Sequence, residues 1–271
     1  MNFLGFPGTM GAPHIDYIVA DRIVIPEGSE IHYSEKPICL PACYLPSDAT
    51  RAIAGNTPTR AQAGLPETGF VFASFNNAYK FNPSMFDIWM RLLKAVPDSV
   101  LWLPERPPLV LRNLRREAEA RGVSASRLVF APLVANPGEH LARLRLIDLF
   151  LDTLPYNAHT TAADALWAGV PILTSPGNSF QGRVAASLLR ALDLPELIAA
   201  TLADYESKAL ALARDRSALR AIRAKLAQNC DTAPLFDTRR FTRNLEAAFI
   251  GMWERRQRGE APASFAVGPA A

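Results

Sequence analysis

The amino-acid sequence predicts an α/β fold in which helices cover both faces of a parallel sheet, and three observations support this. Between residues 70 and 174, continuously apolar segments alternate with amphipathic segments of helical period. After residue 179 the apolar residues keep a helical spacing. Of the 271 residues 49% are hydrophobic, so the chain can bury a substantial core. Strands buried on both faces are apolar throughout, which favours a parallel sheet over a half-exposed one.

The elements are expected in the following order. A buried strand at residues 15–21 precedes a polar stretch with a helical turn or two. Residues 46–68 have no period and are rich in Ala, Pro, Gly, Thr and Arg, which is typical of a linker. The sheet follows, with strands at 70–74, 99–103, 127–131, 148–151 and 170–174 and helices at 84–96, 108–121, 139–144 and after Thr160. Further helices are expected at 180–192, 202–213, 217–227 and 238–253, before a frayed tail at 259–271.

Composition excludes several classes of protein. The net charge is +3, from 29 basic and 26 acidic residues, which argues against broad electrostatic binding of nucleic acid. No apolar run approaches the roughly 20 residues that span a bilayer, and no signal-peptide layout is seen, so no membrane partner is expected. Cys39, Cys43 and Cys230 form neither an even disulfide framework nor a zinc spacing, which favours a reducing, cytoplasmic setting.

Residues 157–174, NAHTTAADALWAGVPILT, are the most informative stretch, because they predict a polar turn, a short helix and a buried strand. Thr160 and Thr161 can cap the helix, so their hydroxyls and the unpaired N–H groups of its first turn would face one point. A diphosphate fits such a site, because a helix N-terminus carries partial positive charge. The alternative interpretation is an ordinary threonine cap beside an exposed His159.

Further polar residues follow the predicted strands, where ligands of open parallel sheets bind. Lys80, in the loop after the strand at 70–74, can neutralise charge on a leaving group, or is a surface lysine. His140 can stack on a base, or is a partly buried, hydrogen-bonded histidine. Arg143 can contact a base or a phosphate, or is solvated. Asp164 can bind ribose hydroxyls, or merely favours its helix N-terminus.

Several catalytic motifs are absent from the sequence. It contains no P-loop, no Gly-x-Gly-x-x-Gly opening a helix, no Gly-x-Ser-x-Gly elbow and no metal-spaced His/Asp cluster. This argues against nucleotide hydrolases, dehydrogenases and esterases. Phosphate binding by a helix start and a lysine, without a metal, suits a sugar-nucleotide transferase.

The chain resembles the catalytic region of the O-linked N-acetylglucosamine transferases, including their SPINDLY-type bacterial and plant relatives. The resemblance covers nearly the whole chain, with the motifs in the family's order. It is carried by GFPGT at 5–9, DYIVAD at 16–21, YSEK at 33–36, FNNAYK at 75–80, PDSVLWL at 97–103, the run around HTT at 159–161 and RVAAS at 183–187.

This resemblance implies a two-lobed glycosyltransferase B-type fold, with a Rossmann-like lobe that holds the donor and no metal or other cofactor. It implies transfer of a sugar, with inversion, from UDP-GlcNAc to Ser or Thr hydroxyls of an acceptor protein. The expected organisation is a remnant of the N-terminal catalytic lobe at 1–45, a linker at 46–68, the donor-binding lobe with C-terminal helices at 69–256 and a disordered tail at 257–271.

The resemblance also implies roles for individual residues. Lys80 is expected to stabilise the departing diphosphate, and Asn77 to lie beside Lys80. His159, Thr160 and Thr161 are expected to cradle the phosphates. His140 and Arg143 would hold the base, and Asp164 would bind the ribose.

Two departures from the family leave alternatives open. The rest of the N-terminal lobe and the tetratricopeptide repeats that usually precede it are expected to be missing, so the chain alone is expected to transfer little sugar. The alternative is a non-catalytic remnant that binds a nucleotide or a protein. Pro137 stands where animal enzymes carry a lysine near the ribose, which keeps GDP-fucose, the donor of plant relatives, as an alternative. A sugar-nucleotide hydrolase or epimerase would need an acid/base pair that the sequence does not show.

Overall fold

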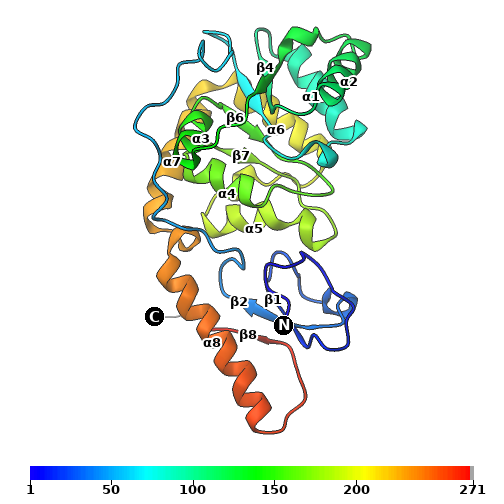
Figure 1. The fold of residues 1–271 in the computed structure, drawn as a ribbon, viewed down its shortest axis with the longest axis vertical. Coiled ribbons are helices and arrows are strands. Elements are labelled where there is room, and N and C mark those ends of the chain that lie inside the picture. The colour runs from blue at the N-terminus through cyan, green and yellow to red at the C-terminus, as the bar shows by residue number, and fades with distance from the viewer. Residues whose placement is uncertain (269–271) are drawn as a thin grey trace.

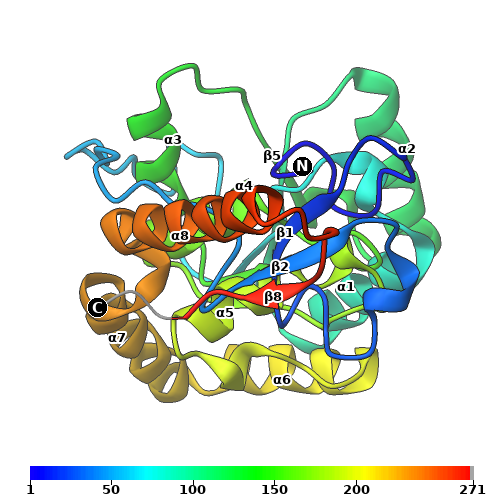
Figure 2. The same ribbon diagram turned by 90° about the horizontal axis from the view of Figure 1, so that it is seen from below.

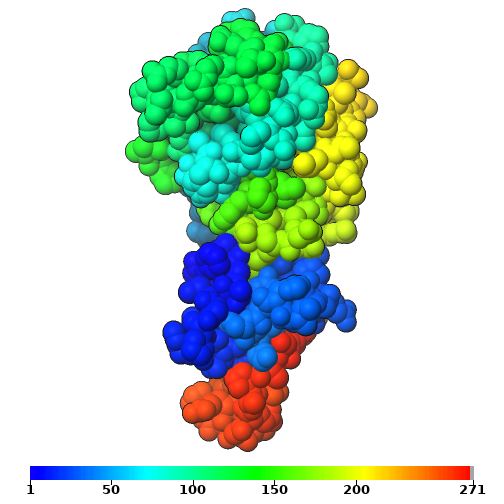
Figure 3. Space-filling model, turned by 90° about the vertical axis from the view of Figure 1, so that its right-hand side faces the viewer, coloured from blue at the N-terminus to red at the C-terminus, as the bar shows by residue number. Residues whose placement is uncertain are grey.

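The computed structural model describes residues 1–268 and has two parallel sheets, each in its own unit (Figure 1). The larger unit contains a five-stranded sheet and the smaller a three-stranded one. Figure 3 shows the smaller unit formed by the two ends of the chain, with the N-terminal segment in blue against the C-terminal segment in red. The predicted α/β class is therefore confirmed, and the structure contains a second parallel sheet besides the predicted one.

The larger sheet has the order β5-β4-β3-β6-β7, and all of its strands are parallel. The strand order reverses between β3 and β6, so the loops after these two strands diverge and leave a crevice at their carboxyl ends. All five predicted strands are present within a few residues of their expected bounds: β3 Val71–Ala73, β4 Val100–Pro104, β5 Leu128–Ala131, β6 Leu149–Leu151 and β7 Ile172–Leu173.

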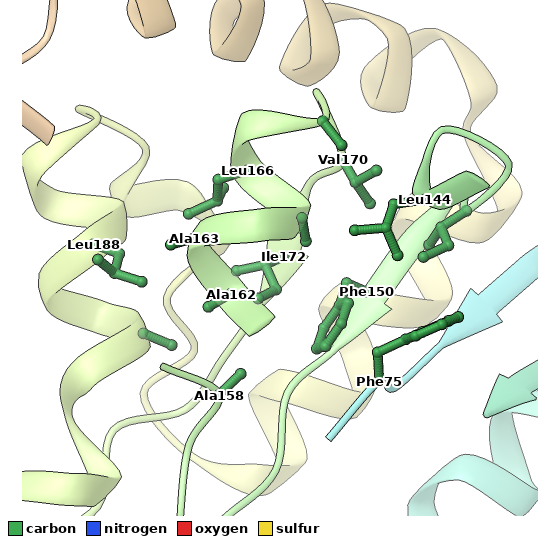
Figure 4. Packing of buried hydrophobic residues seen from close by; sticks show 14 of the residues in the cluster. Phe75, Leu144, Phe150, Ala158, Ala162, Ala163, Leu166, Val170, Ile172 and Leu188 are labelled. Atoms are coloured by element: carbon green, nitrogen blue, oxygen red, sulfur yellow. The ribbon is translucent and has the colours of Figure 1, made fainter. Parts of the chain in front are cut away.

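Helices cover both faces of this sheet because alternate strand residues point to opposite sides. Phe72, Leu101 and Leu149 face one layer, whereas Val71, Trp102 and Phe150 face the other. Figure 4 shows the second layer, where Phe150 and Ile172 meet Ala162 and Leu188. The first layer contains α1 Pro83–Ala95, α2 Pro108–Ala120 and α6 Leu202–Arg214. The second layer contains α3 Pro137–Leu144, α4 Thr160–Trp167 and α5 Val184–Ala191. Helix α7, Arg216–Thr232, packs mainly on the second layer.

The helix expected at 180–192 is divided in the structure. A 3-10 turn, Phe180–Gly182, precedes α5, with Arg183 between them. Gly182 at this division packs closely on the loop after β6, because a Cβ added there would lie 2.7 Å from the carbonyl oxygen of Pro155. The turn thus brings the backbone of residue 181 against the loop that follows β6.

The smaller sheet pairs β1 Tyr17–Asp21, β2 Lys36–Leu40 and β8 Phe265–Ala266, all parallel. The prediction for the tail, 257–271, was therefore wrong at β8; residues 269–271 lie outside the described part. β8 is too short to give a periodic signal in the sequence, and it depends on tertiary contacts. The ring of Phe265 packs against Gly251, and a Cβ added at Gly251 would lie 2.9 Å from that ring.

Helix α8, Thr238–Gln257, packs on this smaller sheet. Its Ala248 is fully buried with Tyr17, Val19 and Ile38. The prediction had placed residues 69–256 in one lobe, but α8 leaves that lobe and covers the other sheet, as Figure 2 shows from below. Helical periodicity specifies an apolar face and not the sheet that will bury it.

A buried aspartate joins the two units. Asp21, at the end of β1, accepts hydrogen bonds from the N–H groups of Val24 and Tyr44 and, at 2.6 Å, from the hydroxyl of Ser187 on α5. Burial raises the pKa of Asp21, while these donors oppose the shift. Tyr44 also packs edge-on against Phe180, with ring centroids 4.8 Å apart. The motifs at 16–21 and 183–187 thus meet at the junction.

Candidate active site

The predicted site residues lie at the carboxyl edge of the larger sheet. Lys80 and Asn77 belong to the loop after β3, His140 and Arg143 to α3 after β5, and the rest to the loop and helix after β6. The structure gathers them in two groups, one around Lys80 and His159 and one around His140 and Arg143.

Lys80 ends a 3-10 turn, Ala78–Lys80, and reaches the loop after β6. Its Nζ donates to the carbonyl oxygen of Asn157 at 2.7 Å and lies 4.1 Å from the ring centroid of Tyr156. Burial lowers the pKa of Lys80 to about 8, although the charge of Asp152 opposes this shift. The side chain is a partly desolvated cation, and the second loop fixes its position.

Asn77 is the N-cap of this turn, but its side chain makes no capping hydrogen bond and is exposed. Its carbonyl oxygen accepts from the N–H of Lys80 at 2.9 Å. Asn77 therefore lies beside Lys80 along the backbone, with its amide free to bind a ligand.

The turn at 159–161 differs from the prediction in one respect. The N-cap of α4 is His159, which makes no side-chain capping bond, and Thr160 and Thr161 are the first helical residues. The first N–H group that bonds within the helix is that of Ala162, so those of Thr160 and Thr161 have no acceptor among the described residues. The threonine hydroxyls do not close the helix end, which leaves its N–H groups available to an anion.

His159 is held as a neutral ring. Its Nε2 lies 3.1 Å from the carbonyl oxygen of Gln181, and the ring stacks on Tyr156 with centroids 5.0 Å apart. A carbonyl oxygen can only accept, so Nε2 carries the hydrogen and Nδ1 keeps its lone pair. Burial, with a smaller contribution from the charge of Lys80, lowers the pKa of His159 to about 4, although the hydrogen bond to Gln181 opposes this shift.

A buried polar network holds these two loops together. Asp152, directly after β6, accepts from the N–H of Ala158 at 2.6 Å and from the hydroxyl of Thr174 at 2.6 Å. Asn76 donates to Thr153 at 2.8 Å and accepts from the hydroxyl of Thr161 at 2.9 Å. Burial raises the pKa of Asp152 to about 6, an effect that its donors oppose. The network fixes α4 relative to the loop that carries Lys80.

The second group contains His140 and Arg143. Nδ1 of His140 accepts from the guanidinium of Arg143, with Nη2 at 2.8 Å. Arg143 also donates to the carbonyl oxygen of Pro132 and lies 5.3 Å from the ring centroid of Phe75. Burial, and then the charge of Arg143, lower the pKa of His140. His140 is thus a neutral ring whose remaining nitrogen, Nε2, can donate to a ligand.

Asp164, which the resemblance assigns to the ribose, already has an ionic partner in the structure. Its Oδ1 pairs with Arg51, which belongs to the segment expected to be a linker. The carbonyl oxygen of Arg51 also accepts from the indole nitrogen of Trp167 at 3.1 Å. Only the second carboxylate oxygen of Asp164 has no partner among the described residues.

Two cavities adjoin these groups. The junction cavity, about 420 Å³, lies between the two units, and the α3 cavity, about 570 Å³, lies beside α3. Both fall in the ~300–1,000 Å³ range of small-molecule sites. The junction cavity is lined by Asn2, Leu4, Gly5, Phe6, Pro7, Ile18, Val19, Tyr44, Leu45, Pro46, Tyr156, His159, Thr160 and Phe180, and the α3 cavity by Ala54, Gly55, Asn56, Thr57, Pro58, Gln62, Ala63, Trp102, Pro132, Val134, Glu139 and Arg143.

Within residues 1–268 no group of three or more His, Cys, Asp or Glu side chains is placed to hold a metal ion. No helix in that range is long and apolar enough to cross a membrane. The cationic and N–H donors described above are the groups that this site offers to a phosphate.

A family model described as "Glycosyl transferase family 41" matches residues 1–57 and 51–245 of the chain. The matched residues include both cavities and both groups of site residues. The chain belongs to glycosyl transferase family 41. Its predicted kinship with the O-linked N-acetylglucosamine transferases is confirmed by curated relatives. A probable UDP-N-acetylglucosamine-peptide N-acetylglucosaminyltransferase of Arabidopsis thaliana, SEC, is 40% identical over 273 residues, which is 98% of this chain. A probable transferase of the same description from Hordeum vulgare, SPINDLY, is 34% identical over 97% of this chain.

Solved structures confirm the glycosyltransferase B-type fold for this family 41 chain. A mutant O-GlcNAc transferase of Thermobaculum terrenum is 33% identical, with a TM-score of 0.86 over 95% of this chain. WaaG, a glycosyltransferase involved in lipopolysaccharide biosynthesis, is 16% identical with a TM-score of 0.60, which concerns the fold alone. The chain spans 28% of the length of each of the two plant relatives and 48% of the bacterial structure.

Sequence reasoning missed two contributors to this family 41 site. Gln181 orients His159 through its backbone carbonyl, and no side-chain pattern reports such a role. Arg51 lies in an irregular segment without any periodic signal, so nothing in the sequence indicates its pairing with Asp164.

Proposed function

We propose that the chain is the nucleotide-sugar-binding part of an inverting, metal-independent glycosyltransferase that transfers GlcNAc from UDP-GlcNAc to Ser or Thr hydroxyls of proteins. The proposal rests above all on one observation: Lys80 and the unpaired N–H groups of Thr160 and Thr161 occupy neighbouring loops at the crevice between β3 and β6. The relatives' names supply the donor and the class of acceptor.

The proposed roles follow from charge. The acceptor oxygen bonds to the anomeric carbon as the bond from that carbon to the diphosphate oxygen breaks. The hydroxyl gives up its proton to the surrounding water, and negative charge gathers on the departing diphosphate. The Lys80 ammonium and the α4 N-terminus stabilise that charge. His159 is neutral at pH 7, so it adds no positive charge of its own and can contribute only hydrogen bonding.

In the same proposal His140 and Arg143 hold the base, Asp164 uses its free oxygen for the ribose, and Asn77 binds near the phosphates. The acceptor protein is the second partner, and an N-terminal lobe with tetratricopeptide repeats is a third, whether on the same polypeptide or another. The setting is cytoplasmic, in line with three free cysteines.

Calorimetric titration of the chain with UDP and then GDP, in EDTA, tests this proposal. We expect selective binding of UDP that weakens when Thr160 and Lys80 are replaced by alanine. Preference for GDP would move the donor towards GDP-fucose, the second candidate, which Pro137 at the start of α3 leaves open because animal enzymes of the family carry a lysine there. Binding of neither nucleotide by the folded chain would contradict the proposal and favour a non-catalytic remnant.

A further inference from the structure

The α3 cavity has two walls from distant parts of the chain. Trp102, Pro132, Val134, Glu139 and Arg143 form the first and belong to the larger sheet and α3. Residues 54–58 with Gln62 and Ala63 form the second and belong to the segment expected to be a linker. Figures 1 and 2 both show this blue-to-cyan segment passing beside α3. We name residues 54–63 the second wall.

The second wall is attached directly to α3. The N–H of Ala54 donates to the carbonyl oxygen of Gly138 at 3.1 Å. A Cβ at Gly138 would lie 3.1 Å from the carbonyl oxygen of Ala52 and 3.4 Å from the nitrogen of Ala54. Because both neighbours are backbone atoms, a side chain at Gly138 has to push the segment outward. The absence of a side chain at this position lets the wall approach the cavity.

Both ends of the wall are anchored as well. On one side Arg51 pairs with Asp164 of α4. On the other, Arg60 donates to the carbonyl oxygen of Gly69 at 3.0 Å and pairs with Asp148 at 3.2 Å. Leu65 beyond it is buried in the main core. The segment is therefore a fixed surface of the cavity and not a loose connection.

The lining groups indicate the kind of molecule that fits. Trp102 contributes to the lining, but its indole Nε1 is itself buried and offers the cavity no accessible donor. Gln62 uses its Oε1 to accept from the N–H of Thr59 at 2.8 Å, so its remaining polar group is a donor. Arg143 adds further donors. Glu139 is the one carboxylate of the lining.

These hydrogen-bond donors of the lining match uracil better than guanine. Uracil presents two carbonyl oxygens and one N–H group, which suit several donors and a single carboxylate. Guanine presents one carbonyl oxygen and more N–H groups on its pairing edge, and it is larger. Apolar Val134, Ala54 and Pro58 provide surfaces for a flat ring.

We propose that residues 54–63 are a specificity-determining wall of the donor site, which closes the α3 cavity around the base and favours uracil over guanine. This inference rests on the proposed function, because it takes the base of a nucleoside diphosphate as the occupant. The inference assigns the selection of uracil over guanine to the segment between the two units together with α3, and not to α3 alone.

Two substitutions displace the wall by different routes. Gly138→Val pushes it outward from α3, and Arg51→Gln releases its anchor on α4 without changing α3. Arg22→Gln is the matched control, because Arg22 also pairs with a carboxylate, that of Glu30 at 3.0 Å, but lies away from the α3 cavity. Calorimetry gives the dissociation constants for UDP, GDP and inorganic pyrophosphate, and circular dichroism reports folding.

We expect the two wall variants to lose about tenfold in UDP affinity and to narrow the preference over GDP, while pyrophosphate binding and the Arg22→Gln variant stay unchanged. Should the unaltered chain bind UDP and the folded Arg51→Gln variant match it in affinity and preference, the wall has no such role and the proposed function stands. Should the unaltered, folded chain bind neither nucleotide, both the function and the wall are contradicted. If Gly138→Val fails to fold, Arg51→Gln decides.

Discussion

The two segments that border the α3 and junction cavities are fixed by different means. The loop after β6 is held by a buried network in which Asp152 and Asn76 are each 1% exposed. The segment 46–68 is held at its surface by ion pairs of Arg51 and Arg60, whose side chains are 28% and 24% exposed. Buried polar networks define one geometry strongly, whereas exposed pairs contribute little stability. We therefore expect the first segment to set the chemistry and the second to adjust selectivity.

The largest effect is expected from Lys80→Ala, because it removes the cation that the buried network positions. In a transfer-active protein that carries this chain, kcat should fall by ~10²–10³, the usual effect of losing one group that stabilises developing charge. The thermal midpoint should hardly move, since a partly exposed lysine contributes little to folding. Lys94→Ala, at an exposed position of α1, is the matched control. Equal loss of folding and activity in Lys80→Ala would contradict the role of Lys80.

Thr174→Val should cost about 1–3 kcal/mol of unfolding free energy, because it leaves one oxygen of the buried Asp152 carboxylate without its hydroxyl donor. Chemical denaturation at pH 7.5 measures this. Thr50→Val, at an exposed threonine bonded to Asp48, should change the same quantity far less. Similar costs at both positions would show that the network is no more important than a surface contact.

His159→Gln should alter how stability depends on pH. The folded-state pKa of His159 is lowered to about 4. Below the ordinary histidine pKa the unfolded chain therefore binds a proton that the folded chain does not, and the folded state loses stability as the pH decreases. Asp152, with a pKa raised to about 6, acts in the opposite direction, because its folded form binds the proton more readily. Without His159 the Asp152 effect remains. The variant should gain about 1–2 kcal/mol relative to the unaltered chain on going from pH 8 to pH 5. Parallel pH profiles would refute this.

Arg60→Gln should have the smallest effect, below about 1 kcal/mol at low salt and less at high salt, because its ion pair with Asp148 is partly exposed and screened. Urea denaturation at two salt concentrations measures it. If Arg60→Gln lowered the unfolding free energy as much as Thr174→Val, the surface ion pairs of segment 46–68 would stabilise the protein as strongly as the buried network does.

The same contrast explains what could be predicted from the sequence. The strands of the larger sheet and the residues after them could be predicted, because burial on both faces leaves unbroken apolar runs and the strand order brings their ends together. Whether Lys80, His159 and their neighbours act as assigned stays a prediction. The sequence could not show that His159, and not a threonine, precedes α4, because both residues suit a turn. Nor could it show that Arg51 reaches Asp164 or that α8 and β8 complete the smaller sheet, since these contacts join distant residues without a local signal.

The pairing of β2 with β8 has a consequence for the order of folding. Ile38 and Phe265 are register partners although almost the whole larger unit lies between them in sequence. Such a pairing closes a very long loop, and its entropic cost is met only once the intervening chain is already compact. The smaller sheet should therefore assemble last. During synthesis β1 and β2 would wait for β8, which follows the whole larger unit in sequence, so the smaller sheet would be completed after the larger one has been made.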